Sequence, residues 1–181
     1  MKRTLTAAGL ILLLPLMVSA APKDPVGPEV IRAFQAAGLP VEENGIRPID
    51  FELSLLDGTR LKLADLKGRP VFLNFWATWC GPCRSEMPSM EAVYKRLKDR
   101  GFGILAVNVG EDSKQVSPFM RRYGLSFPVA FDTTSQVSTR YGIQAIPTTY
   151  IIDKRGLIIS RIVGSIDWNT PEIIAAFESL L

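Results

Sequence analysis

The chain's two cysteines, Cys80 and Cys83, lie two residues apart in the stretch WCGPC, residues 79–83. A pair at this spacing can be half of a zinc site, a short structural disulfide, or a dithiol that is oxidised and reduced during turnover. Structural zinc takes four protein ligands, and this chain has no other cysteine and no histidine. A disulfide that closes so short a loop removes little conformational entropy from the unfolded chain. The residue types therefore favour a redox-active dithiol over the other two alternatives.

The pair lies at the junction of a predicted strand and a predicted helix. The segment VFLNFW, 71–76, is apolar on both faces except for Asn74, which is typical of a central strand covered on both sides. Over residues 82–100 apolar side chains recur at helical spacing. At the start of this helix Cys80 would meet free backbone N–H groups and the positive end of the helix dipole, which favour the nucleophilic thiolate. Cys83, one turn further, is expected to be more buried and to act as the resolving thiol.

The remaining segments predict an α/β fold. The expected strands are 51–55 and 59–63, 71–76, 103–109, 127–131, 148–153 and 157–163, and the expected helices are 28–37, 82–100, 113–123 with an interruption at Pro118, 135–141, and one that begins with Thr170 as cap. Asp57-Gly58 indicates a two-residue turn that joins the first two strands into an N-terminal β-hairpin. Alternating strands and helices, followed by a closing hairpin and helix, predict a central mixed β-sheet flanked by helices.

The N-terminus has the pattern of a secretory signal peptide. Lys2 and Arg3 precede an apolar run over 7–18, and small residues follow up to Ala21. We therefore expect residues 1–20 to be removed and the protein to be exported. The alternative is an uncleaved membrane anchor, although about 12 apolar residues fall short of the ~20 that span a bilayer. Cleavage would lower the formal net charge from +3 to +1, and nothing in the charge pattern suggests nucleic-acid binding.

The rest of the chain predicts one domain without a cofactor. We expect an extension with a short helix over 21–46 and the main domain over 47–181. The length after cleavage is enough for a single hydrophobic core that does not depend on its two cysteines for stability. The sequence has no glycine-rich phosphate loop and no flavin or nicotinamide motif, so we expect no organic cofactor and no metal.

Two longer stretches resemble a known family. The motif FWATWCGPC is followed by a helix with Pro88 five residues after Cys83, and Ile146-Pro147 precedes the late hairpin. More narrowly, DLKGRPVFLNFWATWCGPCRSEMP and FPVAFDTTSQVSTRYGIQAIPTTYIID resemble the TlpA/ResA-like periplasmic thioredoxins. The resemblance covers residues 47–181 and implies a thioredoxin-like fold.

The resemblance also implies roles for individual residues. Cys80 would be the attacking cysteine, Cys83 the resolving cysteine, and Trp79 the aromatic residue that flanks them. Pro147 would be a cis-proline packed against the pair, with Ile146 offering its backbone to an extended substrate peptide.

Asn74 and Glu86 mark a difference from cytosolic thioredoxins. Those proteins carry a buried aspartate where this chain has Asn74, and asparagine cannot take a proton from Cys83. Glu86, three residues after Cys83, matches the position where TlpA-like proteins carry a functional glutamate. The alternative for Glu86 is a solvated carboxylate paired with Arg84 or a nearby lysine.

The function implied is that of a secreted thiol-disulfide oxidoreductase that reduces disulfides in periplasmic proteins. The family's substrates include apocytochrome c, and its electron donor is a membrane thiol carrier, so we expect both kinds of partner. Ile146 before Pro147, and Gly81-Pro82 between the cysteines, resemble reducing more than oxidising thioredoxins. The alternatives are a disulfide oxidant or isomerase, a peroxidase, and a non-catalytic copper metallochaperone on the same fold.

Overall fold

The computed structural model describes residues 25–181, so the predicted signal peptide, 1–20, lies outside the described residues. The elements, in chain order, are α1 (Pro28–Ala36), β1 (Glu52–Leu55), β2 (Arg60–Lys62), the 3-10 helix η1 (Leu63–Leu66), β3 (Val71–Trp76), α2 (Gly81–Leu97), the 3-10 helix η2 (Lys98–Arg100), β4 (Gly103–Val109), α3 (Ser113–Tyr123), β5 (Val129–Asp132), α4 (Gln136–Arg140), β6 (Thr148–Ile152), β7 (Ile158–Val163) and α5 (Pro171–Glu178). Within residues 25–181, every helix is too short or too polar to cross a membrane.

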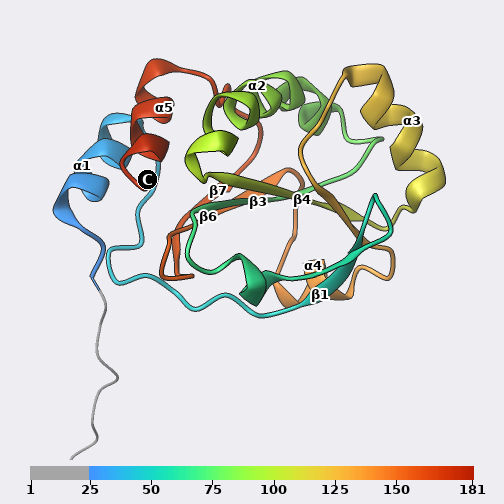
Figure 1. Cartoon of the computed structure of the whole chain (residues 1–181), viewed down its shortest axis with the longest axis horizontal. Helices are drawn as coiled ribbons and strands as arrows, with labels where there is room; N and C mark the ends of the chain where they lie inside the picture. The colour runs from blue at the N-terminus through green and yellow to red at the C-terminus, as the bar shows by residue number, and fades with distance from the viewer. Residues whose placement is uncertain (1–24) are drawn as a thin grey trace, which may run out of the picture.

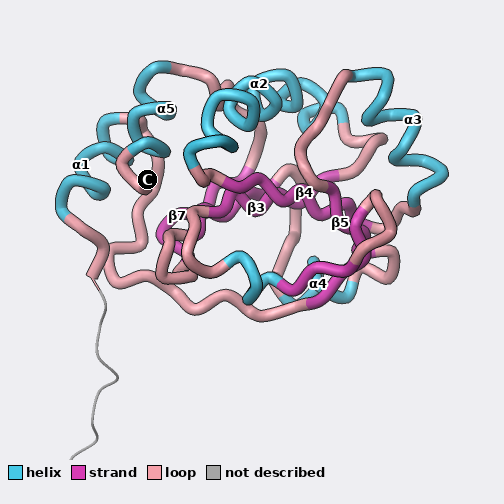
Figure 2. The backbone as a smooth tube through the Cα atoms, viewed as in Figure 1, coloured by secondary structure: helices cyan, strands magenta, loops and turns pink. Residues whose placement is uncertain are grey.

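The strands form one seven-stranded mixed sheet, which confirms the predicted fold class (Figures 1 and 2). Their order is β2-β1-β5-β4-β3-β6-β7. The pairs β3–β4 and β4–β5 are parallel, and the other neighbours are antiparallel. Every residue of β3 is buried, as its apolar sequence predicts, because β4 and β6 flank it and helices or loops cover both faces.

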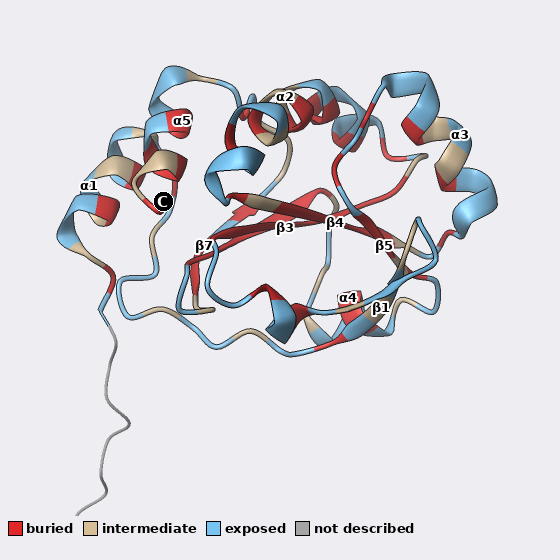
Figure 3. Ribbon diagram, in the orientation of Figure 1, coloured by how far each residue is buried: buried red, intermediate tan, exposed pale blue. Residues whose placement is uncertain are grey.

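Two hydrophobic cores lie on opposite faces of the sheet (Figure 3). Alternate residues of β3 point to opposite sides, so Phe72 and Trp76 join the core under α2, α3 and α5, whereas Leu73 and Phe75 join the core over α4 and η1. Asn74 shares the first of these faces with Phe72 and Trp76. This alternation places Asn74 beneath the helix that carries the cysteines.

The N-terminal extension packs on the domain. Phe34 of α1 is fully buried, and its ring meets that of Phe177 in α5 edge-on, with centroids 6.4 Å apart. The following segment runs beside the edge strand β7, where the Ile46 N–H donates to the Ile158 carbonyl oxygen over 2.8 Å and the Ile158 N–H donates back to Ile46. The extension therefore covers one edge of the sheet and contributes to the core.

Two local predictions differ from the structure. Residues 56–58 lie between the paired Leu55 and Thr59, so the hairpin has a three-residue connection within the predicted strand bounds and not the predicted two-residue turn, with Gly58 in the left-handed region at φ 85°. Helix α3 also runs without interruption through Pro118. Proline removes only the hydrogen bond to the carbonyl of Lys114, and because both residues are exposed, water can satisfy that carbonyl.

Candidate active site

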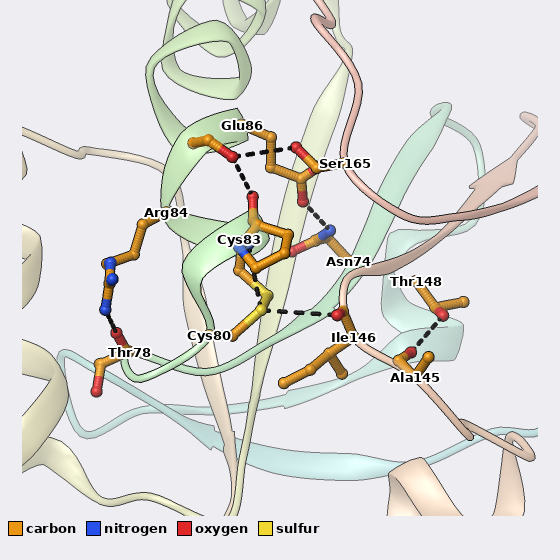
Figure 4. Close-up of a disulfide and its surroundings, with 12 residues drawn as sticks. Asn74, Thr78, Cys80, Cys83, Arg84, Glu86, Ala145, Ile146, Thr148 and Ser165 are labelled. Carbon is orange, nitrogen blue, oxygen red and sulfur yellow. Dashed lines mark hydrogen bonds between the residues drawn. A yellow bond between two sulfur atoms is a disulfide. The ribbon is translucent and has the colours of Figure 1, made fainter.

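Cys80 and Cys83 form a disulfide at the start of α2, with Cα atoms 5.3 Å apart (Figure 4). Cys80 is the N-cap of the helix, and its Sγ accepts a hydrogen bond from the Cys83 N–H at 3.2 Å. Pro82 lies in the first turn, where a missing N–H costs no helical hydrogen bond. Cys83 is fully buried whereas Cys80 is 5% exposed, which confirms the predicted order of burial. Of the two cysteines, Cys80 is therefore the more accessible to solvent.

The loop before β6 lies beside this sulfur. The Ile146–Pro147 peptide bond is cis, as the resemblance implied, and the Ile146 carbonyl oxygen lies 3.6 Å from the Cys80 Sγ. Figure 4 shows Ile146 facing the disulfide, with the Thr148 hydroxyl donating to the Ala145 carbonyl at 2.7 Å behind it. A stretch of backbone is thus fixed next to the reactive sulfur.

Trp79 occupies the loop between β3 and α2, immediately before Cys80. Its side chain is 67% exposed, in contrast to the fully buried Trp76 three residues earlier. The structure therefore places a solvent-exposed aromatic ring on the residue that precedes Cys80.

Glu86 lies one turn after Cys83, and its side chain points into the protein (Figure 4). The residue is 2% exposed, and its carboxylate accepts hydrogen bonds from Asn74 Nδ2 at 3.0 Å and Trp168 Nε1 at 2.9 Å. Burial raises the pKa of Glu86 to about 7, although these two hydrogen bonds and one from the Ile166 backbone favour the ionised form. The alternative of a solvated carboxylate paired with Arg84 or a lysine is wrong, because β3 and the loop before α5 enclose this face of α2.

Asn74 supports Glu86 from the central strand. Its amide nitrogen donates both to Glu86 and to the Thr149 hydroxyl, the latter at 2.9 Å. Its Oδ1 is buried and has no hydrogen-bond partner among the described residues. When Glu86 is protonated, its O–H needs an acceptor, and rotation of the Asn74 amide would turn the Asn74 Oδ1 toward it. The position that carries aspartate in cytosolic thioredoxins thus holds an amide that binds a carboxylate from the helix.

Glu111 holds the loop that leads into Cys80, and the sequence analysis did not identify it. Its buried carboxylate accepts from the Thr78 N–H at 2.7 Å, from the Thr78 hydroxyl, and from Asn108 Nδ2 at 2.8 Å. Arg84 also donates to the Thr78 carbonyl at 3.3 Å. Because β3 and β4 are parallel neighbours, residues that follow them meet at the same sheet edge, and this rule could have pointed to Glu111.

Trp168 was also missed, and no local signal marks it. It lies in the loop before α5, is fully buried, and packs edge-on against Phe72 with ring centroids 4.7 Å apart. Its backbone N–H is bound by the Ser89 hydroxyl at 3.1 Å. These contacts fix the indole that donates to Glu86.

Comparisons with known proteins agree with this geometry. A family model described as the AhpC/TSA family matches residues 45–161. The thiol-disulfide oxidoreductase ResA of Bacillus subtilis is 41% identical over 156 residues, which cover 86% of this chain and 85% of that protein. ResA of Geobacillus thermodenitrificans is 47% identical over 116 residues, 64% of this chain and 67% of the relative.

A solved structure shows the same fold around the same kind of chemistry. A thiol:disulfide interchange protein of the thioredoxin family from Chlorobium tepidum superposes with a TM-score of 0.65 at 31% identity, covering 77% of this chain and 98% of that one. The chain belongs to the AhpC/TSA family and, within it, to the ResA-like thiol-disulfide oxidoreductases of thioredoxin fold.

Proposed function

We propose that the protein reduces disulfide bonds in other polypeptides through the dithiol form of Cys80 and Cys83. The observation that carries this proposal is the pair's position, with Cys80 capping α2 beside the Ile146 carbonyl and Cys83 buried behind it. The Cys80 thiolate attacks one substrate sulfur, which breaks the substrate disulfide, forms a mixed disulfide and releases one substrate thiol. The Cys83 thiolate then attacks the Cys80 sulfur and releases the second thiol. Two electrons pass to the substrate, and the enzyme is left oxidised.

In this proposal Glu86 accepts the proton that Cys83 must lose before it can attack. Glu86 lies on the same face of α2, one turn from Cys83, and its pKa of about 7 is close to neutral pH. A general base is most effective when its pKa lies near the working pH. The hydrogen bonds from Asn74 and Trp168 hold the carboxylate in place through the cycle.

Substrate binding is assigned to the surface around the disulfide. The backbone at Ile146, next to Pro147 and to the Cys80 sulfur, would pair with an extended substrate segment, and the exposed Trp79 ring would cover its side chains. Backbone hydrogen bonds suit such an enzyme because they accept many sequences.

The direction of electron flow gives a direct test. We expect the Cys80–Cys83 couple to have a reduction potential nearer the ~−270 mV of thioredoxin than the ~−120 mV of the strong oxidant DsbA. The Gly81-Pro82 pair between the cysteines and Ile146 before Pro147 support this expectation. Titration of the oxidised protein against glutathione and dithiothreitol buffers measures the potential. A value near −120 mV would reverse the direction and favour a disulfide oxidant.

The site of action is proposed to be the periplasm. The N-terminal pattern and the family resemblance support export, a membrane thiol carrier as electron donor, and apocytochrome c among the substrates. Intact mass of the protein recovered from the periplasm is expected to show cleavage near Ala20 or Ala21. A full-length chain found only in membranes would instead support an uncleaved anchor.

A further inference from the structure

A groove of about 300 Å³ lies between helix α3 and the start of α2, the helix that carries the disulfide. One wall comes from Thr78 and Arg84, which lie two residues before and four residues after Cys80. The other wall comes from α3, where Gln115 and Arg122 are seven residues apart and therefore on one face of the helix. The groove therefore lies at the start of the helix that carries Cys80, although neither cysteine lines it.

The floor of the groove is aromatic and rigid. The rings of Phe119 and Tyr123 stack with centroids 4.4 Å apart, and Phe119 also packs on the buried Trp76 of β3 at 5.3 Å. Tyr123 is nevertheless 41% exposed. Because the core holds Phe119 in place, this apolar surface is preformed and binding does not have to order it.

The rim of the groove is positively charged. The guanidinium groups of Arg84 and Arg122 line it, and within residues 25–181 neither forms an ion pair. The neighbouring acidic side chains are occupied, since Glu111 binds Thr78 and Asn108 while Asp112 caps α3 by accepting from the Lys114 N–H. Arg84 donates one hydrogen bond to the Thr78 carbonyl at 3.3 Å, so both guanidinium groups keep N–H donors for an external anion.

We propose that this groove binds the substrate polypeptide beside its disulfide and selects a carboxylate side chain next to an apolar or aromatic one. The proposal rests on the proposed function, because residues two before and four after the attacking Cys80 line the groove. The carboxylate meets Arg122 and Arg84, whose planar guanidinium groups suit bidentate binding, and the apolar neighbour covers the Phe119–Tyr123 stack. Acidic substrates are thereby reduced faster than neutral or basic ones.

The test uses synthetic peptides that each contain one disulfide and carry Glu, Gln or Lys at successive positions near the reactive cysteine. Rates of reduction by the reduced enzyme are measured by stopped-flow tryptophan fluorescence at low and high salt. At one position or more, the Glu peptide is expected to react about five times faster than the Gln peptide at low salt, the order expected for exposed ion pairs. The preference is expected to shrink at high salt.

Two matched variants localise the effect. Arg122→Ala is expected to bring the ratio of the Glu-peptide rate to the Gln-peptide rate close to one. Arg121→Ala removes the same charge from the adjacent residue, which does not line the groove, and is expected to leave this ratio unchanged. Equal rates for all peptides, or the same loss in Arg121→Ala, would overturn the groove proposal while leaving disulfide reduction intact. If no peptide is reduced at all, the proposed function itself fails, and the groove proposal fails with it.

Discussion

Replacement of Cys83 by alanine is expected to abolish turnover and to leave Cys80 covalently joined to its substrates. The variant still has the attacking sulfur at the start of α2, so the first exchange proceeds and a mixed disulfide forms. The second exchange needs the Cys83 thiolate, and because that residue is fully buried behind Cys80, few external thiols can replace it efficiently. We expect disulfide-linked adducts to accumulate and catalytic reduction to fall by about a thousandfold or more, as when a catalytic nucleophile is removed.

The measurement is non-reducing electrophoresis of the protein purified from its host, followed by mass spectrometry of the trapped partners. Cys80→Ala is the matched control, since it retains the buried cysteine but lacks the accessible one and should trap few partners. Apocytochrome c among the adducts of Cys83→Ala would support a role in cytochrome maturation. Adducts of equal yield from Cys80→Ala would show that the assignment of the two cysteines is wrong.

Glu86→Gln is expected to make the protein more stable at pH 8 and to leave its stability at pH 4 nearly unchanged. Glu86 has a pKa of about 7 in the folded protein, against an ordinary value of 4.5 in the unfolded chain. The folded state therefore holds a proton that the unfolded state loses, and the parent's free energy of unfolding decreases as pH rises from 4.5 to 7. Over that range the parent's free energy of unfolding falls by about 3 kcal/mol, because each pH unit contributes roughly 1.36 kcal/mol.

Glutamine imitates the protonated carboxyl, because each keeps an oxygen that accepts from Trp168 Nε1 and offers a donor to the Oδ1 of a rotated Asn74 amide. Urea unfolding of the oxidised parent and variant at several pH values measures the difference between their free energies of unfolding. Other titrating groups are the same in both proteins, so their contributions cancel in this difference. A difference that does not change with pH would contradict the assigned pKa.

Glu91→Gln is the matched control on the same helix. Glu91 is also buried, and burial acts to raise its pKa, but hydrogen bonds from the Ser126 hydroxyl and N–H and from Lys95 outweigh burial and lower it. The ionised carboxylate of Glu91 therefore stabilises the folded protein above pH 4.5, and this stabilisation is lost as pH falls through the lowered pKa. Glu91→Gln removes it and is expected to destabilise the protein at pH 8. The two variants should thus shift stability at pH 8 in opposite directions.

The same Glu86→Gln variant also tests the proposed base. If Glu86 takes the proton of Cys83, the variant releases mixed disulfides more slowly and has an altered pH dependence between about pH 6 and 9, where thiols titrate. If the variant has the same rate and pH profile as the parent, Glu86 is not the base and its role is structural.

The sequence by itself determined the features that depend on neighbouring residues. The apolar run of β3, the helical spacing that follows it and Pro82 in the first turn predicted the strand, the helix and the junction at Cys80, all of which the structure confirms. Thiolate stabilisation at a helix start is also a local effect, because the N–H that binds Cys80 belongs to Cys83, three residues away. The cis bond before Pro147 required the family resemblance, since the residue types alone are compatible with a trans bond.

Only the tertiary structure decided the environment of Glu86 and the support of the reactive loop. The sequence places Glu86 three residues after Cys83, but its two side-chain hydrogen-bond partners lie 12 residues earlier, in β3, and 82 residues later, before α5. Glu111 likewise reaches Thr78 from 33 residues away because β4 lies beside β3. The pKa of a carboxyl depends on how much water its surroundings exclude and which donors they supply, and packing between distant segments sets both.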